Sequence, residues 1–501
     1  MLTADRMAAV EANAAALGVS RTRIAEASAS AVAREVRDCV GSDAVGEAGG
    51  ATVAVVAGLG ANGGVALAAA RHLDEFGPSV SLLGRPESIA SSTARENWDA
   101  LVAAELDART VVDPRTLALG DADVVVDGIL GPAVSEAPAE PERTAIEAVD
   151  AAEGTVVAVD VPSGLDGNGG DPPGAVVDAD RAVSFHAAKP GLDAVPAVTV
   201  ADVGVPSAAE RFAGPGGLRA IRDGLRADRG EDASGRVMVV GGGPYTGAPA
   251  LSAQAALAGG ADLTFLAVPE AVADPVRGYA EDLIVQPFPG EHLAPEEVDD
   301  LVETATDHDD VVVLGPGLGD ADETRVAVER FLSAFDGRGV VDADAIPAVT
   351  AVETDATLVL TPNADELTET GGPSVDDLRG SAPAIESFAA DLGHALAVKR
   401  AETLVTDGAE TRIARTGTPG MTVGGTGDLF AGLTAAFLDV AAPVDAAATA
   451  AYVKGRAGER LAERRGETFV ASDLLAEFAP TIDEREPCAT ASRRDAAGAR
   501  R

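Results

Sequence analysis

Short runs of apolar residues recur along the chain, separated by longer stretches of mixed polar and apolar character. The runs predict strands at 52–57, 123–126, 156–159, 236–240, 310–314 and 357–360. Several of these runs end in glycine or proline. Strands that alternate with helices and end in glycine-rich loops are typical of parallel sheets, which bind ligands at the carboxyl ends of their strands. The pattern therefore predicts the α/β fold class.

A polar stretch rich in glycine and proline, at 207–234, separates the strands into two sets. A chain of 501 residues also exceeds the roughly 250–300 residues that one core supports. We predict an N-terminal domain at 1–214, built as a Rossmann-like doubly wound sheet, and a C-terminal α/β domain at 215–482. Residues 483–501 lack apolar periodicity, so a disordered tail is expected there.

The composition favours aliphatic cores and excludes some partners. Apolar residues make up 46% of the chain, with only one Trp and three Tyr. Acidic residues are spread throughout, and the formal net charge is −43. Phosphate contacts need clustered Lys and Arg, and no such cluster stands out, so neither nucleic acid nor an anionic membrane is expected as a partner.

Lysine is nearly absent and occurs only as Lys189, Lys399 and Lys454. This composition resembles that of halophilic proteins, whose carboxylate surfaces stay soluble in molar salt. Cys39 and Cys488 have neither metal-site nor disulfide spacing. No run approaches the roughly 20 apolar residues of a membrane span, and the N-terminus lacks a signal-peptide pattern. We therefore expect a soluble, cytoplasmic protein.

The segment 419–428, Pro-Gly-Met-Thr-Val-Gly-Gly-Thr-Gly-Asp, precedes an apolar helical pattern. Glycines that lead into a helix leave backbone N–H groups free to bind an anion, and the helix dipole adds partial positive charge. Asp428 could then accept the proton of a substrate hydroxyl while the amides stabilise a transferring phosphate. The alternative is a tight turn in which Asp428 only complements the helix N-terminus.

Three other loops in the second half follow predicted strands and are rich in glycine or polar residues: 241–249, 315–319 and 361–367. Together with Asp342-Ala-Asp344 and the segment 419–428, they resemble the ribokinase-like fold, and more narrowly the ADP- or ATP-dependent NAD(P)H-hydrate dehydratases. The resemblance covers most of 235–460. It implies a magnesium ion bound with ADP.

The resemblance also assigns roles to single residues. It implies that Asp428 is the base and that the hydrated nicotinamide is bound by Ala248, Gly317, Asn363 and Asp428. It implies a nucleotide site formed by Lys399, Arg400, Ala401, Glu402, Thr403, Gly425, Thr426 and Gly427. Arg400 stands where the family has glycine. Its guanidinium could itself contact a phosphate, and the alternative is a surface Lys–Arg pair.

In the first half, the strand at 52–57 leads into a glycine loop at 58–64 and a helix predicted at 65–73. Asp127 and Asp160 each follow an apolar strand, where a doubly wound sheet binds its ligands. The glycine loop alone is too common to indicate dinucleotide binding, and the aspartates could simply cap turns.

These motifs and the segment 185–192, Phe-His-Ala-Ala-Lys-Pro-Gly-Leu, resemble the NAD(P)H-hydrate epimerases, over most of 1–210. The resemblance implies that Asp160 is the acid or base of epimerisation. It implies a potassium ion held by Asn62, Asp127 and Ser163. It implies that the hydrated cofactor is bound by Ala61, Asn62, Gly63, Gly64, Val65, Gly131, Pro132, Ala133, Val134, Ser135, Glu136, Ala137 and Asp160.

The first half departs from the family pattern Asn-Asn-Gly-Gly-Asp, because this chain has Ala61 and Val65 at its two ends. Valine cannot donate a hydrogen bond or carry charge. Slower epimerisation is therefore expected.

The favoured hypothesis is a bifunctional enzyme that epimerises hydrated NADH and NADPH and dehydrates the S form with ADP. One alternative is a ribokinase-like kinase for a small molecule, with a regulatory nucleotide-binding N-terminal domain. Another is a dinucleotide sensor without catalysis. With the favoured hypothesis, a homo-oligomer is expected.

Overall fold

The computed structural model describes residues 1–41, 51–226 and 235–484. The predicted tail therefore lies, from residue 485 onward, outside the described residues. The chain divides into two compact units, Met1–Ala209 and a second unit that begins at Glu210, five residues before the predicted boundary. The predicted fold class, two α/β domains built on parallel sheets, is confirmed.

The first unit contains a seven-stranded sheet in the order β3-β2-β1-β4-β5-β6-β7, and every pair of neighbouring strands is parallel. The strands are β1 (Val53–Ala57), β2 (Ser79–Leu83), β3 (Ala108–Val111), β4 (Val124–Gly128), β5 (Thr155–Val159), β6 (Arg181–Phe185) and β7 (Ala197–Ala201). The strand order reverses between β1 and β4. In doubly wound sheets the ligand crevice opens at this point, outside the carboxyl ends of the strands.

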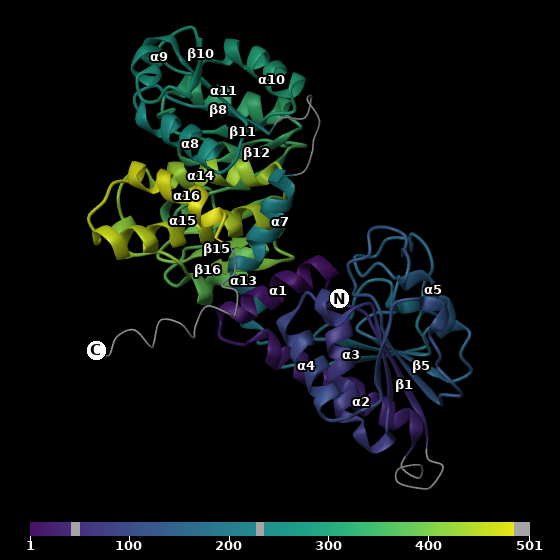
Figure 1. Cartoon of the computed structure of the whole chain (residues 1–501). Helices are drawn as coiled ribbons and strands as arrows, with labels where there is room; N and C mark the ends of the chain where they lie inside the picture. The colour runs from purple at the N-terminus through teal and green to yellow at the C-terminus, as the bar shows by residue number, and fades with distance from the viewer. Residues whose placement is uncertain (42–50, 227–234, 485–501) are drawn as a thin grey trace, which may run out of the picture. The chain divides into compact units, whose positions relative to one another are not determined.

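Helices cover both faces of the first sheet (Figure 1). They are α1 (Ala4–Ala16), α2 (Arg21–Val40), α3 (Ala61–His72), α4 (Ser92–Ala103) and α5 (Glu142–Asp150), and the short α6 (Ala208–Arg211) spans the division between the units. Val53 and Val55 of β1 pack with α2, α3 and α4, whereas Ala54 and Val56 pack with α5. Alternate residues of a strand face opposite sides, so a strand buried on both faces is apolar throughout.

The second unit contains a nine-stranded sheet in the order β10-β9-β8-β11-β12-β13-β14-β15-β16. The strands are β8 (Arg236–Val240), β9 (Leu263–Pro269), β10 (Ile284–Phe288), β11 (Val311–Leu314), β12 (Arg338–Val341), β13 (Thr357–Leu360), β14 (Ala395–Lys399), β15 (Thr403–Thr406) and β16 (Thr411–Ala414). All neighbouring pairs are parallel except β14–β15 and β15–β16, which are antiparallel.

Two helical layers enclose this sheet as well. The helices are α7 (Pro215–Arg226), α8 (Gly247–Ala258), α9 (Glu270–Arg277), α10 (Val298–Asp307), α11 (Asp322–Ala334), α12 (Ala364–Glu369), α13 (Leu378–Leu392), α14 (Thr426–Leu438), α15 (Pro443–Arg465) and α16 (Leu475–Ile482). Val237 and Val239 of β8 pack with α8, α14, α15 and α16, and Met238 and Val240 pack with α10 and α11. No helix within the described residues is long and apolar enough to span a membrane.

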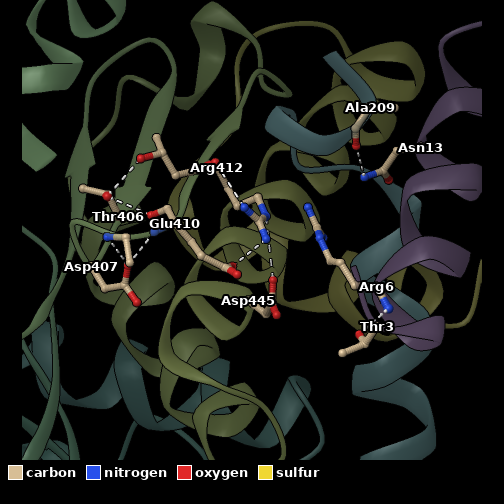
Figure 2. Close-up of polar contacts among 11 residues, drawn as sticks. Thr3, Arg6, Asn13, Ala209, Thr406, Asp407, Glu410, Arg412 and Asp445 are labelled. Atoms are coloured by element: carbon tan, nitrogen blue, oxygen red, sulfur yellow. Dashed lines mark hydrogen bonds and ion pairs between the residues drawn. The ribbon is translucent and has the colours of Figure 1, made fainter. Parts of the chain in front are cut away.

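The β15–β16 hairpin closes one edge of the second sheet, and Figure 2 shows its polar contacts. The side chain of Asp407 accepts hydrogen bonds from the backbone N–H groups of Ala409 and Glu410, at 2.9 and 2.8 Å. Arg412, on β16, forms an ion pair of 2.7 Å with Glu410 and lies 3.9 Å from Asp445 near the start of α15. The hairpin is thus tied both to its own turn and to a covering helix.

Candidate active sites

Asp160 directly follows β5 and has a positive φ of 67°. A non-glycine residue in this region is uncommon and is often found at functional sites. Its Oδ1 atom accepts hydrogen bonds from the Nζ of Lys189 at 2.5 Å, the N–H of Phe185 at 3.1 Å and the Oγ of Ser184 at 3.3 Å. Its Oδ2 atom has no hydrogen-bond partner among the described residues. One oxygen is therefore held and the other is available.

Lys189 is 1% exposed, and Asp160 is 5% exposed. A buried lysine needs a counter-charge and hydrogen-bond acceptors, and here Asp160 and the carbonyl of Phe185 supply them. The segment 185–192 contributed to the resemblance, but Lys189 was not predicted as a site residue. The structure places it in contact with the predicted catalytic carboxylate.

Glu11 is a second carboxyl group near this pair, and sequence reasoning did not identify it. Burial raises the pKa of Glu11, and the charge of Asp160 raises it further. The N–H of Leu2 donates to the carbonyl of Ala188, and the N–H of Ala4 donates to that of Gly167, so the start of α1 is tied to loops at the carboxyl edge of the sheet. Nothing in the sequence near Glu11 signals this placement.

Asn62, Asp127 and Ser163, which were predicted to bind potassium, lie together. Ser163 donates from its Oγ and its N–H to Asp127, at 2.6 and 2.8 Å. Its Oγ accepts from the N–H of Leu130, whose carbonyl in turn accepts from the side chain of Asn62 at 3.2 Å. Burial raises the pKa of Asp127, which has no cationic partner among the described residues.

The predicted substrate loop at 61–65 is helical instead of irregular. The helix was expected to begin at Val65, but α3 begins at Ala61. The glycines permit this because a Cβ on Gly63 would lie 2.0 Å from the carbonyl oxygen of Gly58. Ala61 is exposed, whereas Val65 is 7% exposed and packs in the core shared by α2, α3 and α4.

The second predicted substrate segment, 131–137, follows β4 at the same edge of the sheet. The carbonyl of Pro132 accepts from the N–H of Gly167 at 2.8 Å, and Gly131 lies beside the Asn62 side chain. Ala133, Ser135, Glu136 and Ala137 are exposed, and Gly131, Pro132 and Val134 are half-buried. This segment is therefore accessible beside the Asn62–Asp127–Ser163 cluster.

In the second unit, Asp428 lies in the first turn of α14, and Gly425 caps that helix with a positive φ of 94°. Nearby, Asp342 accepts hydrogen bonds from Lys399 at 2.8 Å and from the hydroxyl of Thr361 at 2.6 Å. Burial raises the pKa of Asp428 to about 7, and the charge of Asp342 contributes, while Lys399 opposes the shift. A carboxylate with a pKa near neutrality suits a general base.

The other predicted substrate residues lie at the carboxyl ends of neighbouring strands. Gly317 has a φ of 73°, and a Cβ there would lie 2.6 Å from the carbonyl oxygen of Tyr245. Ala248 is in the first turn of α8, one turn before Ser252, whose Oγ donates to the carbonyl of Asp428 at 3.0 Å. Asn363 caps α12 with its side-chain oxygen and pairs through its backbone with Lys399.

The predicted nucleotide segment 399–403 connects β14 to β15. Burial lowers the pKa of Lys399, but the charges of Asp342 and Glu366 outweigh it and raise the pKa overall. Lys399 thus interacts with acidic groups and is not part of a surface Lys–Arg pair. Arg400 is exposed, and its guanidinium donates to the carbonyl of Val375. Glu402 pairs with Arg379 at 2.5 Å, Ala401 is exposed and Thr403 is buried. Within this segment, Lys399 lies closest to the glycines at 425–427, since a Cβ on Gly427 would lie 3.4 Å from its Nζ.

Two α/β sheets, one parallel and one mostly parallel, each with a lysine–aspartate ion pair at the carboxyl ends of its strands, are typical of a two-domain enzyme. Residues 21–191 match the family model described as YjeF-related protein N-terminus, and residues 237–480 match the model described as NAD(P)H-hydrate dehydratase. The chain belongs to the family of bifunctional NAD(P)H-hydrate repair enzymes, as its similarity to curated relatives shows.

Curated relatives named bifunctional NAD(P)H-hydrate repair enzyme Nnr align with nearly the whole chain. The protein from Methanothermobacter thermautotrophicus is 38% identical, covering 94% of this chain and 93% of its own. That from Pyrobaculum aerophilum is 37% identical, covering 95% and 96%. Among solved structures, the ADP/ATP-dependent NAD(P)H-hydrate dehydratase from Bacillus subtilis co-crystallised with ATP/Mg²⁺ is 20% identical, covers 54% of this chain and 97% of its own, and has a TM-score of 0.45.

Proposed function

We propose that this chain repairs hydrated NADH and NADPH by two reactions in series. The first unit interconverts the R and S epimers at the hydroxyl-bearing ring carbon. The second unit dehydrates the S epimer with ADP. The observation that carries the proposal is Asp428, a carboxylate with a pKa near 7 in the first turn of a helix that begins with glycines, beside the Lys399–Asp342 pair.

In the dehydration, Asp428 takes the proton of the ring hydroxyl, and the hydroxyl oxygen attacks the β-phosphorus of ADP. The bond to the AMP oxygen breaks, and the amides at Gly425, Thr426 and Gly427 stabilise the charge on the transferring group. The ring nitrogen then expels phosphate, and the neighbouring ring carbon loses a proton. The sum is hydrated NAD(P)H plus ADP giving NAD(P)H, AMP and phosphate.

In the epimerisation, the bond between the ring carbon and its hydroxyl oxygen breaks with help from the ring nitrogen. Water then re-forms that bond on the other face of the ring. The departing oxygen leaves as hydroxide. The free Oδ2 of the Asp160 carboxylate can take a proton from the incoming water and then return it to that hydroxide, because Oδ1 is fixed by Lys189, Phe185 and Ser184.

The oxygen atoms of Asn62, Asp127 and Ser163 fit a potassium ion. Asp127 is a fully buried carboxylate without a cationic partner among the described residues, and the amide nitrogen of Asn62 already donates to the carbonyls of Val159 and Leu130. The amide oxygen of Asn62 is therefore left for a cation. A potassium ion would neutralise Asp127 and order the neighbouring segment 131–137.

Magnesium bound with ADP is part of the proposal for the second unit. Within the described ranges, no three His, Cys, Asp or Glu side chains are grouped as a metal site. Magnesium commonly binds through substrate phosphates and few protein carboxylates, and we propose that it enters with the nucleotide. The remaining site assignments, a cytoplasmic location and a homo-oligomeric state stay predictions.

The test is recovery of NADH absorbance from an equal mixture of hydrated epimers in molar KCl with magnesium. ADP, ATP and no nucleotide are compared, and spontaneous epimerisation is subtracted. Recovery beyond half of the substrate is expected for the native chain with ADP. With Asp160→Asn, recovery of NADH should stop near half of the substrate. With Asp428→Asn, no NADH should be recovered, although the variant should still bind nucleotide.

The alternatives predict other outcomes. A small-molecule kinase would accumulate a stable phosphorylated product, and a dinucleotide sensor would bind cofactor without turnover. Full recovery with Asp428→Asn would remove the mechanism proposed for the second unit.

A further inference from the structure

Lys454 is the third lysine of the chain, and neither unit's proposed chemistry uses it. It lies on α15, and its Nζ is 4.9 Å from the centroid of the Phe430 ring, two residues after Asp428 on α14. Lys189 and Lys399 each pair with an aspartate, but Lys454 has no carboxylate or hydrogen-bond partner among the described residues. The chain has 81 acidic residues, so this unpaired ammonium group stands out.

The charges that act on Lys454 are among those that act on Asp428. Burial and, to a lesser extent, the nearby charge of Lys399 lower the pKa of Lys454 to about 8, and the charge of Asp342 opposes the shift. The two charged groups that act on Lys454 are thus the pair beside the glycines at 425–427. An ammonium group on an aromatic face next to another cation is poorly stabilised without an anion.

Small residues hold this part of α15 against the segment that leads to those glycines. A Cβ on Gly455 would lie 2.3 Å from the Oγ1 of Thr416, and one on Gly458 would lie 2.2 Å from the sulfur of Met421. The hydroxyl of Thr416 donates to the carbonyl of Tyr452 at 3.0 Å. The backbone on both sides of Lys454 is therefore fixed beside the start of α14.

We propose that Lys454 is a further ligand for the phosphoryl groups of the nucleotide, whose negative charge is its missing counter-ion. This inference rests on the proposed nucleotide-dependent function of the second unit. A compact ammonium group suits the role because it acts as a point charge on phosphate oxygens. Lys399 is already committed to Asp342, so Lys454 supplies the uncommitted positive charge at the site.

The test is equilibrium binding of ADP to the full chain by titration calorimetry, without hydrated cofactor. Lys454→Met should weaken ADP binding by about 10- to 100-fold, the range for a lost hydrogen bond to a charged group. Lys454→Arg should retain most of the affinity. Arg456→Met is the matched control: it removes a cation from the same helix, but one already paired with Glu459 at 3.2 Å, and it should change affinity less than twofold.

A second measurement uses the native chain and does not depend on a variant's folding. ADP affinity should fall between pH 8 and 9.5 by up to about tenfold per pH unit as Lys454 loses its proton. Asp428, with a pKa of about 7, is already ionised in that range, and Lys399, whose pKa is raised, keeps its charge. Lys454→Arg should remove this dependence.

Equal ADP affinity in the native chain and Lys454→Met, with no pH dependence above 8, would overturn the inference and leave the proposed function standing. Failure of the native chain to bind ADP at all would overturn both.

Discussion

Asp428 and Asp160 are both aspartates at the carboxyl edge of a parallel sheet, but their neighbours differ. Asp160 has a buried lysine within 2.5 Å of one oxygen. Near Asp428, the corresponding lysine, Lys399, is hydrogen-bonded to Asp342 instead. The ammonium group therefore fixes the carboxylate in the first unit, whereas in the second it is bound to another aspartate, which is consistent with the role of base proposed for Asp428.

The pH dependence of dehydration tests this role for Asp428. The base must be ionised, so kcat/KM for the S hydrate should rise with pH, reach half of its maximum at about pH 7 and level off above that. Burial is the largest cause of the raised pKa, and salt does not screen it, so the midpoint should persist in molar KCl. A rate constant that stays flat from pH 5.5 to 8 would contradict the assignment.

The Asp160–Lys189 pair should contribute strongly to the stability of the first unit. Lys189→Met leaves Asp160 buried without its cation, and a loss of about 3–5 kcal/mol in the free energy of unfolding is expected. The control is the double variant Asp160→Asn/Lys189→Met, which removes both charges and should recover part of the loss. Denaturant unfolding measures the free energy of unfolding of the single and the double variant. Equal losses in the two would mean that the charge left on Asp160 is not the cause.

The sequence predicted Asp428 and Asp160 because each lies next to a local signal, a glycine-rich helix start or the end of an apolar strand. It did not predict Glu11 or the role of Lys189, which is 29 residues from Asp160. Such partners depend on how α1 and the segment after β6 fold back over the sheet. Glu11 has no periodic or glycine pattern around it that would signal this long-range placement, whereas Lys189 stands in the segment 185–192 that contributed to the resemblance, which assigned it no role.

At the scale of elements, each of the six predicted strands overlaps an observed strand, but buried strands such as β2, β6 and β14 were not predicted. The strands predicted at 236–240 and 357–360 agree with β8 and β13 in both bounds. The edge strands β7 and β10 were not predicted, because each exposes several residues and lacks a continuous apolar run. The start of α3 was missed because its glycines suggested a loop, whereas they serve close packing against Gly58 and Ala94.

Glycine also sets how closely α8 and α14 approach. A Cβ on Gly432 would lie 1.9 Å from the carbonyl oxygen of Ser252, so Gly432→Ala should push the two helices apart. We expect the second unit to lose about 1–3 kcal/mol or more of stability, and dehydration to slow because Ser252 holds the Asp428 backbone. Gly247→Ala, at an exposed position of α8 with open space around it, is the stability control. Calorimetry measures the thermal midpoints of both variants. Equal midpoints for Gly432→Ala and Gly247→Ala would contradict the packing argument.

At the scale of the whole molecule, the two units have their own sheets and cores, and the net charge is shared along the chain. A formal charge of −43 should destabilise the compact state by self-repulsion at low salt. Raising the salt from 0.1 to 1 M shortens the screening length from about 10 to 3 Å.

The thermal midpoint should therefore rise by several degrees between 0.1 and 3 M KCl. NaCl is the control, because both salts screen surface charge equally. Any extra rise of the first unit's thermal midpoint in KCl therefore reports on the Asn62–Asp127–Ser163 cluster. That extra gain should vanish in Asp127→Asn. A midpoint that is constant in both salts would mean that surface repulsion does not limit stability.

The placement of the three lysines has a consequence for covalent chemistry. Apart from the α-amino group at Met1, every primary amine of the chain belongs to Lys189, Lys399 or Lys454, all at or beside a proposed site, while arginine and histidine supply the other basic side chains. Acylation, glycation and carbamylation, which elsewhere scatter over a protein's exterior, therefore find few lysine targets on the folded chain, because Lys189 is 1% exposed and Lys399 is ion-paired with Asp342. A modified lysine would mark a molecule that had opened around one of the proposed sites, so modification and lost turnover should appear together.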